Sequence, residues 1–272
     1  MWLFCLFLTV AVLAEVLLTA LTEMNFWPRL LLGFGVFVLL HVLYLLYLYL
    51  VSLTVDMKKP LEKQNAVCRR GCARMIGLLC FYCGVRPRIT GLEKLPEEER
   101  FLLVCNHRSM FDPLIIMDKL RRWNISFISK PSNLQIPVIG RIARAAGFLS
   151  IDRENDRKAL KTILQAADYL KRGLCSMAVY PEGTRSKSGE MLPFHAGSFK
   201  IAQRAGVPLV IAAVRGTEKV GKNLLFKGTD VSLDILEVLP AEQVKAMSTG
   251  ELSDYSRASI QAWLDGRKVD LA

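Results

Sequence analysis

Two long apolar runs at the start of the chain predict a pair of membrane helices. Residues 1–21 are apolar apart from Glu15 and a few threonines, and residues 30–55 form a second run that His41 interrupts. At a rise of about 1.5 Å per residue, each run is long enough to cross a hydrocarbon core of about 30 Å. With a turn at residues 25–28, we expect a helical hairpin over residues 1–56 that either spans the bilayer or enters one leaflet.

The stretch after the second run is basic, and it predicts an interfacial helix and an orientation. Residues 57–85 contain six lysines and arginines, and apolar residues recur at helical intervals between residues 64 and 84. Such a helix lies against a lipid surface or under the following domain. The turn between the apolar runs carries far less positive charge, so the positive-inside rule places the residues after Val55 in the cytoplasm.

From residue 86 the pattern changes to short apolar runs that alternate with amphipathic segments. This alternation predicts an α/β fold for residues 86–272, with a mainly parallel central sheet flanked by helices. Functional side chains in such folds lie beyond the carboxyl ends of the strands. We expect strands at residues 88–91, 101–105, 125–129, 148–151, 174–180, 209–214 and 231–238, and helices at 113–123, 138–146, 156–172, 198–205 and within 241–264.

The polar residues after the expected strand at 101–105 form a candidate catalytic pair, His107 and Asp112. A carboxylate that accepts a hydrogen bond from one ring nitrogen fixes the tautomer of an imidazole and prepares the other nitrogen to accept a proton. A five-residue offset separates two side chains on a straight helix, so we expect a bend between them. Either Asp112 caps a helix that begins at Pro113, or Ser109 and Asp112 form a capping box. A pair this short also occurs as a plain helix cap beside a structural histidine.

A second group of polar residues suits a phosphate ligand. The loop after the expected strand at 174–180 reads Tyr-Pro-Glu-Gly-Thr-Arg-Ser. Its turn offers backbone donors, a hydroxyl and an arginine fork, and its glutamate either holds the loop or orients an arginine. Two further cations, Lys130 and Arg153, follow the expected strands at 125–129 and 148–151. We therefore expect a phosphate-binding rim of Lys130, Arg153, Glu182, Gly183, Thr184 and Arg185.

Composition narrows the classes of partner. Of the 272 residues, 52% are hydrophobic, and this excess is concentrated before Val55. The net charge of +11 favours anionic partners: a phospholipid membrane, a phosphorylated substrate or an acidic carrier protein. No nucleic-acid-binding module is evident. The spacing of Cys80 and Cys83 is typical of zinc ligands, but no second pair or nearby histidine completes a site, so we expect no metal.

Taken in order, these motifs resemble the glycerolipid acyltransferases, and most closely the bacterial 1-acyl-sn-glycerol-3-phosphate acyltransferases. The four sequence blocks of that family are matched by Asn106, His107, Ser109 and Asp112; by Gly147, Ile151 and Arg153; by residues 182–185; and by residues 207–210. The resemblance covers roughly residues 86–238. Arg108 and Ser150 depart from the family pattern, which has glutamine and an aromatic residue there, and both adjoin the expected substrate cleft.

The resemblance implies a membrane enzyme that moves a fatty acyl group from a thioester to the sn-2 hydroxyl of lysophosphatidate, giving phosphatidate. His107 would act as the base and Asp112 would align it. Acyl-coenzyme A or acyl-acyl carrier protein would be the co-substrate, with no further cofactor. Two alternatives remain: transfer to glycerol 3-phosphate or another lysophospholipid, and a noncatalytic scaffold that binds anionic lipid. A lipase-like hydrolase would need a Gly-x-Ser-x-Gly elbow, which the sequence lacks.

Overall fold

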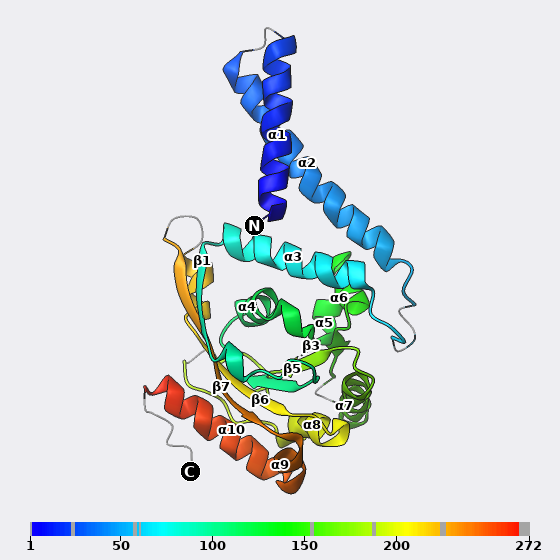
Figure 1. The fold of residues 1–272 in the computed structure, drawn as a ribbon, viewed down its shortest axis with the longest axis vertical. Helices are drawn as coiled ribbons and strands as arrows, with labels where there is room; N and C mark the ends of the chain where they lie inside the picture. The colour runs from blue at the N-terminus through cyan, green and yellow to red at the C-terminus, as the bar shows by residue number, and fades with distance from the viewer. Residues whose placement is uncertain are drawn as a thin grey trace.

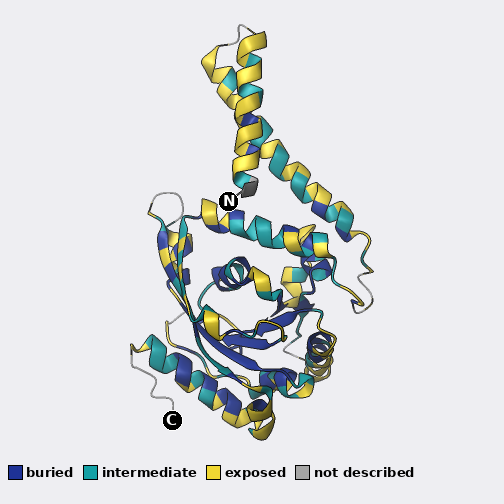
Figure 2. Ribbon diagram, viewed as in Figure 1, coloured by how far each residue is buried: buried dark blue, intermediate teal, exposed yellow. Residues whose placement is uncertain are grey.

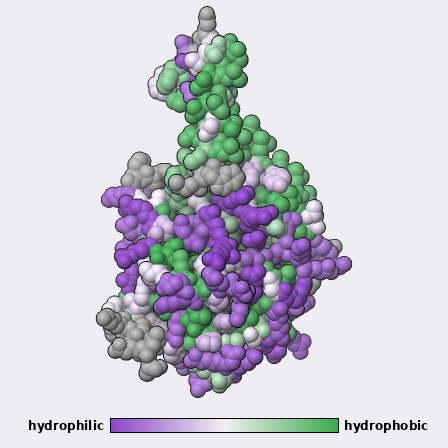
Figure 3. Space-filling view, in the orientation of Figure 1, coloured by the Kyte–Doolittle hydropathy of each residue, from purple (hydrophilic) through white to green (hydrophobic). Residues whose placement is uncertain are grey.

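The computed structural model describes residues 2–22, 25–56, 59, 61–152, 155–186, 189–223 and 227–266. Helices α1 (Trp2–Leu21) and α2 (Phe26–Ser52) form the expected hairpin, which projects from an α/β body (Figure 1). Both helices are long and apolar enough to cross a membrane. Hydrophobic side chains cover the hairpin, whereas the visible face of the body is mainly hydrophilic (Figure 3). One expectation was wrong: residues 26–28 belong to α2, because a proline is tolerated in the first turn of a helix.

Helix α3 (Ala66–Tyr82) packs between the hairpin and the α/β body. The Asn65 side chain caps its start by accepting hydrogen bonds from the N–H groups of Val67 and Cys68. A Cβ atom on Gly77 would lie 2.6 Å from the Asp118 carboxylate, so the glycine permits close packing of α3 against the body. The structure therefore shows α3 packed against the α/β body, which was one of the two positions expected for it.

The centre of the body is a seven-stranded sheet in the order β1-β7-β6-β2-β5-β3-β4. Only the β6–β7 pair is antiparallel, which confirms the expected mainly parallel sheet. Strand β2 lies in the middle, paired with β5 on one side and β6 on the other. The strands are β1 (Val85–Thr90), β2 (Leu102–Cys105), β3 (Ile125–Ser129), β4 (Leu149–Ser150), β5 (Ser176–Val179), β6 (Leu209–Arg215) and β7 (Thr229–Leu239).

Helices cover both faces of the sheet, so the central strands are buried (Figure 2). On one face Leu102 and Val104 of β2 join the core formed with α7, α8 and α10; on the other Leu103 and Cys105 face α4. The helices of the body are α4 (Phe111–Lys119), α5 (Pro131–Leu134), α6 (Ile139–Ala145), α7 (Asp156–Lys171), α8 (Lys200–Ala205), α9 (Ala241–Ala246) and α10 (Thr249–Leu264). Short 3₁₀ helices occupy Leu92–Lys94, Arg121–Trp123, Ala196–Phe199 and Thr217–Lys222.

The helix boundaries differ from the expected ones where local hydrogen bonds compete with apolar periodicity. Helix α4 begins at Phe111 and ends at Lys119, and a separate 3₁₀ turn follows it. The segment 241–264 is two helices, because Ser248 is extended and starts α10 with a capping box to Glu251. Helix α5 and the 3₁₀ helix at 217–222 were not predicted from the sequence.

Candidate active site

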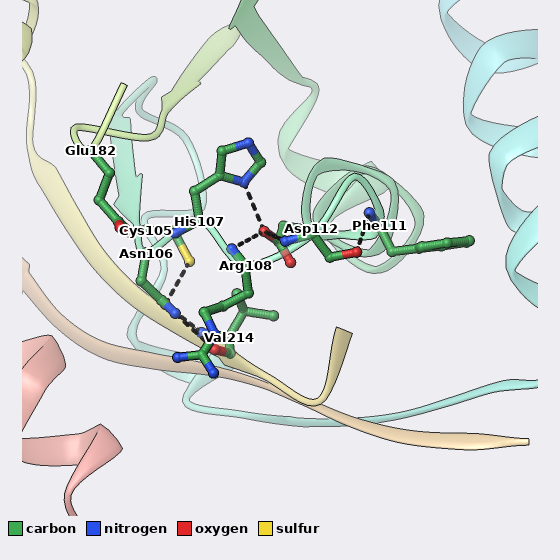
Figure 4. Close-up of polar contacts among 9 residues, drawn as sticks. Cys105, Asn106, His107, Arg108, Phe111, Asp112, Glu182 and Val214 are labelled. Atoms are coloured by element: carbon green, nitrogen blue, oxygen red, sulfur yellow. Dashed lines mark hydrogen bonds and ion pairs between the residues drawn. The ribbon is translucent and has the colours of Figure 1, made fainter. Parts of the chain in front are cut away.

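The loop that follows β2 begins at a buried asparagine. Asn106 is fully buried, and its side-chain amide donates to the Val214 carbonyl oxygen at 3.0 Å while its oxygen accepts from the Val214 N–H at 2.9 Å (Figure 4). These two bonds join the carboxyl ends of β2 and β6. The position of the next residue, His107, is thereby set by the sheet.

His107 and Asp112 form the expected pair. The imidazole Nδ1 lies 2.8 Å from the Asp112 Oδ2, and the Asp112 side chain is fully buried whereas that of His107 is 18% exposed. The same carboxylate oxygen accepts from the N–H groups of Arg108 at 2.7 Å and Ser109 at 2.8 Å. Because the carboxylate can only accept, we assign the Nδ1 proton to this bond, which leaves the Nε2 lone pair able to take a proton.

The helix start matches neither expected alternative fully: α4 begins at Phe111 with Met110 at the N-cap position, and only one of the two hydrogen bonds of a capping box forms between Ser109 and Asp112. The Ser109 hydroxyl accepts from the Phe111 N–H at 3.3 Å, and Asp112 in the first turn of α4 accepts from the Ser109 N–H. The helix thus begins before Asp112, and its first turn brings the carboxylate back toward His107. The Arg108 side chain points away from the imidazole (Figure 4) and donates to the Gly189 carbonyl oxygen.

Tyr180 is a site residue that sequence reasoning missed. Its ring stacks on the His107 imidazole, with 4.1 Å between centroids and 14° between planes. Burial, reinforced by the nearby Asp112 and Cys105, raises the pKa of the Tyr180 hydroxyl well above its ordinary value, so the phenol stays neutral. Among the described residues its hydroxyl has no hydrogen-bond partner. The available signal was an aromatic residue directly after β5, as the first residue of the phosphate-type loop.

Glu182 braces two loops of the site. Its Oε1 accepts from the His107 N–H at 2.6 Å and its Oε2 accepts from the Leu192 N–H at 2.9 Å. The carboxyl is 3% exposed, and burial raises its pKa although the two N–H donors oppose this effect. The Ser186 N–H also donates to the His107 carbonyl oxygen at 3.0 Å. Of the two roles expected for Glu182, these contacts show that of holding the loop.

The remaining rim residues lie at the ends of neighbouring strands. Gly183 has φ +71°, which the turn after β5 requires, and Thr184 and Arg185 beyond it are exposed. Lys130 is exposed directly after β3, the strand beside β5. The topology therefore brings Lys130 and the 182–185 loop to the same edge of the sheet as His107. Arg153 lies outside the described residues.

The described part of the chain contains no group of three or more His, Cys, Asp or Glu side chains arranged to hold a metal ion. All seven cysteines carry free thiols. The arrangement at the end of β2 offers a polarised imidazole with a buried carboxylate behind it. Such a pair can remove a proton from a hydroxyl group placed at Nε2.

Comparison with known proteins shows which proteins this chain is similar to. Residues 86–215 match the family described as Acyltransferase. The chain is 33% identical over 164 residues to the 1-acyl-sn-glycerol-3-phosphate acyltransferase of Salmonella typhimurium (strain LT2), covering 59% of this chain and 65% of that protein. The enzyme of the same name from Escherichia coli (strain K12) is 34% identical over 156 residues, which cover 57% of this chain and 62% of the relative. These matches thus span just under two thirds of the relatives' length.

A solved structure shares the fold. The crystal structure of the 1-acyl-sn-glycerophosphate (LPA) acyltransferase PlsC from Thermotoga maritima superposes with a TM-score of 0.60 at 24% sequence identity. The superposition covers 85% of this chain and 97% of that one. At this level of identity the likeness establishes the fold alone.

Proposed function

Because this chain carries a domain of the acyltransferase family at residues 86–215, we propose that it transfers a fatty acyl group from a thioester to the sn-2 hydroxyl of 1-acyl-sn-glycerol 3-phosphate. The product is phosphatidate, a precursor of phospholipids. The observation that carries the proposal is the hydrogen-bonded His107–Asp112 pair at the centre of the matched domain. The names of the relatives support the choice of acceptor.

The proposed reaction is a direct transfer with one general base. Nε2 of His107 takes the proton of the acceptor hydroxyl as that oxygen attacks the thioester carbonyl carbon. The carbon–sulfur bond then breaks, and the imidazolium returns the proton to the leaving thiolate. A positioned base of this kind contributes about 10²- to 10⁴-fold in rate. The substrate supplies the attacking hydroxyl, so the route needs no serine nucleophile, in contrast to a Ser-His-Asp hydrolase.

The phosphate of the acceptor occupies the rim beside the base. Lys130 and Arg185 supply positive charge, Thr184 a hydroxyl and Gly183 the turn that exposes backbone donors. Arg153 is proposed for the same rim from its sequence position. Holding the phosphate fixes the hydroxyl near Nε2, which converts part of the binding energy into orientation. Glu182 acts indirectly, by bracing the loop against His107.

The acyl donor is a co-substrate, acyl-coenzyme A or acyl-acyl carrier protein. Both carriers are acidic, and the net charge of +11 suits either one. The hairpin of α1 and α2 keeps the enzyme in the membrane where the acceptor lies, and the basic residues after α2 place the catalytic domain on the cytoplasmic side.

A transfer assay with the full chain in liposomes tests the proposal. Wild type, His107→Ala and the control His195→Ala receive labelled lysophosphatidate with acyl-coenzyme A or acyl-acyl carrier protein. We expect labelled phosphatidate from wild type and from the His195 variant, and a loss of at least about 10²-fold in the His107 variant. The better donor identifies the carrier.

Other outcomes separate the alternatives. Product only with glycerol 3-phosphate or another lysophospholipid would change the acceptor and keep the mechanism. Undiminished turnover in His107→Ala would overturn the mechanism. An absence of product with every donor and acceptor would favour the noncatalytic lipid-binding scaffold.

A further inference from the structure

The α/β body exposes a compact apolar corner between α5 and α6. Among the described residues after 85, six large hydrophobic side chains are exposed, and three of them lie within four positions. These are Ile136 at 45%, Val138 at 37% and Ile139 at 56% exposure. The three form what we term the α5–α6 corner, residues 136–139. A cluster of this kind on an otherwise polar surface marks an interaction site.

The corner has a tight and unusual backbone. The Ile139 N–H donates to the Pro137 carbonyl oxygen at 2.7 Å, which closes a three-residue turn around Val138. Val138 has φ 64° and ψ −62°, a conformation that a β-branched residue rarely adopts. A Cβ on the next residue, Gly140, would lie 2.2 Å from the Leu134 carbonyl oxygen, so α5 and α6 meet closely here. The structure therefore holds the apolar side chains outward on a constrained turn.

Helix α6 fixes this corner to the end of the hairpin. Ile142 and Ala145, on its buried side, share a core cluster with Leu48 of α2 and Cys68 of α3. The Arg141 guanidinium donates to the Val55 carbonyl oxygen at 3.2 Å, just beyond the end of α2. In Figure 1, α5 and α6 lie beside the body-side end of α2. The corner thus lies where an apolar helix meets the body.

The charge of the surrounding sequence fits an anionic lipid surface. Residues 130–151 contain three lysines and arginines and no aspartate or glutamate, whereas the cations before them, at residues 119–122, pair with Asp118 or Glu97. Two of these cations, Arg141 and Arg144, directly follow the apolar residues on α6. Apolar side chains flanked by cations are the combination that binds at the boundary of headgroups and acyl chains.

We propose that the α5–α6 corner is a second membrane contact, through which the catalytic domain itself inserts apolar side chains into an anionic phospholipid bilayer. Ile136, Val138 and Ile139 enter the acyl-chain region, and Arg141 and Arg144 remain at the headgroups. The contact holds the carboxyl end of β3, where Lys130 lies, against the lipid surface. The proposal takes the α1–α2 hairpin to lie in the same bilayer, and it does not depend on the proposed reaction.

Lipid quenching of a fluorophore tests this contact in the full chain. In a Cys5→Ser background, which removes the exposed native thiol, an environment-sensitive fluorophore is attached at Ile139→Cys or Ile136→Cys. The protein is placed in nanodiscs of phosphatidylglycerol and phosphatidylcholine that contain lipids spin-labelled on their acyl chains. Two matched controls are Leu160→Cys on α7, exposed by 45%, and Leu46→Cys on α2, exposed by 47%.

We expect spin-labelled lipid to quench the fluorophore at 136, 139 and 46 at least twofold and to leave position 160 unchanged. Quenching at 46 without quenching at 136 or 139 would show that only the hairpin enters the bilayer, and it would overturn the proposal. Equal quenching at 139 and 160 would overturn it as well, because the contact would then not be specific to the corner. An absence of quenching at position 46 would show that the hairpin is not in the bilayer. Because the proposal takes the hairpin to lie in the same bilayer, this result would refute the proposal as well.

Discussion

At the scale of single residues, His107 is held from three directions. Asp112 binds its Nδ1, the Tyr180 ring covers one face of its imidazole, and Glu182 accepts from its backbone N–H. All three partners are more than nine-tenths buried, so water competes little with these contacts. The imidazole is therefore oriented before substrate binds, which lowers the cost of reaching a reactive geometry.

Asp112→Asn tests the alignment of the base. The amide keeps the size of the carboxylate but loses the charge that stabilises an imidazolium, and it can present a donor to Nδ1. We expect kcat to fall by about 10²- to 10⁴-fold with KM for the acceptor little changed. Steady-state kinetics measure kcat and KM, and far-ultraviolet circular dichroism checks that the variant is folded. A loss confined to KM would mean that Asp112 serves substrate binding instead.

Tyr180 offers a pair of substitutions with opposite results. Tyr180→Phe keeps the ring on His107 and removes a buried hydroxyl that lacks a partner among the described residues. Because an unsatisfied buried polar group costs about 1–3 kcal/mol, this variant should be active and more stable to heat. Tyr180→Leu removes the stacked ring and should lower kcat with only a minor change in KM. Equal activity of the two variants would exclude a positioning role for the ring.

At the scale of elements, α3 packs at Gly77 over a carboxylate at the end of α4 that is buried and ion-paired. Asp118 is 6% exposed and pairs with Lys119 at 2.8 Å and with Arg121. Burial alone would raise the pKa of the Asp118 carboxyl, but hydrogen bonds and charge from the two cations outweigh it and lower that pKa below its ordinary 3.8. Gly77 of α3 lies directly over this carboxylate. Acid should therefore weaken the contact between α3 and α4.

Asp118→Asn tests that contact and its pH dependence. Because the folded-state pKa is lowered, the carboxylate contributes stability above its unfolded-state pKa and loses this contribution as pH falls through the folded-state value. At pH 7 we expect the variant to be less stable by about 1–3 kcal/mol, and the difference to shrink as pH falls below about 4. Melting temperatures in detergent across this range measure the difference.

Asp168→Asn is the matched control. Asp168 pairs with Arg172 at 3.1 Å on the surface of α7, with side chains exposed by 50% and 39%. Exposed pairs of this kind contribute little to stability, so its melting temperature should stay near that of wild type. If both variants lose the same stability at every pH, the effect is not due to the buried ion pair.

At the scale of the whole molecule, both body-side ends of the hairpin pack against α3. Phe4 near the start of α1 packs against Phe81 and Tyr82 of α3, and Leu48 near the end of α2 packs over Gly71. The end of α1 and the start of α2 lie far from the α/β body in Figure 1. The 27 residues of α2 measure about 40 Å at 1.5 Å per residue, longer than a hydrocarbon core of about 30 Å.

This length favours a hairpin that spans the bilayer, and labelling of single cysteines tests it. A membrane-impermeant maleimide should modify Thr22→Cys, next to the turn, on intact cells and should reach Lys245→Cys on α9 only after lysis. The native exposed thiol is removed by Cys5→Ser in both variants. Modification of Thr22→Cys only from the cytoplasmic side, or from neither side, would instead indicate a hairpin that enters one leaflet.

The order of elements and the pairing of His107 with Asp112 could be predicted from the sequence. Long apolar runs predict membrane helices by their length alone. Short apolar runs predict strands that are buried on both faces, and the amphipathic segments between them predict helices that are buried on one face. His107 and Asp112 are five positions apart, so one bend suffices to join them. The domain boundaries at residues 56 and 85 and the phosphate rim stay predictions.

Only the tertiary structure decided what surrounds the pair. Asn106 bonds to Val214 across 108 positions, and Glu182 bonds to His107 across 75, because β2 lies between β5 and β6. The position of Tyr180 over the imidazole has the same cause. Strand order depends on how whole elements pack, and no local periodicity records which distant residues then meet. The sequence thus determined the helices, the strands and the pairing of His107 with Asp112, whereas the packing of the sheet determined the contacts that hold the His107 imidazole in place.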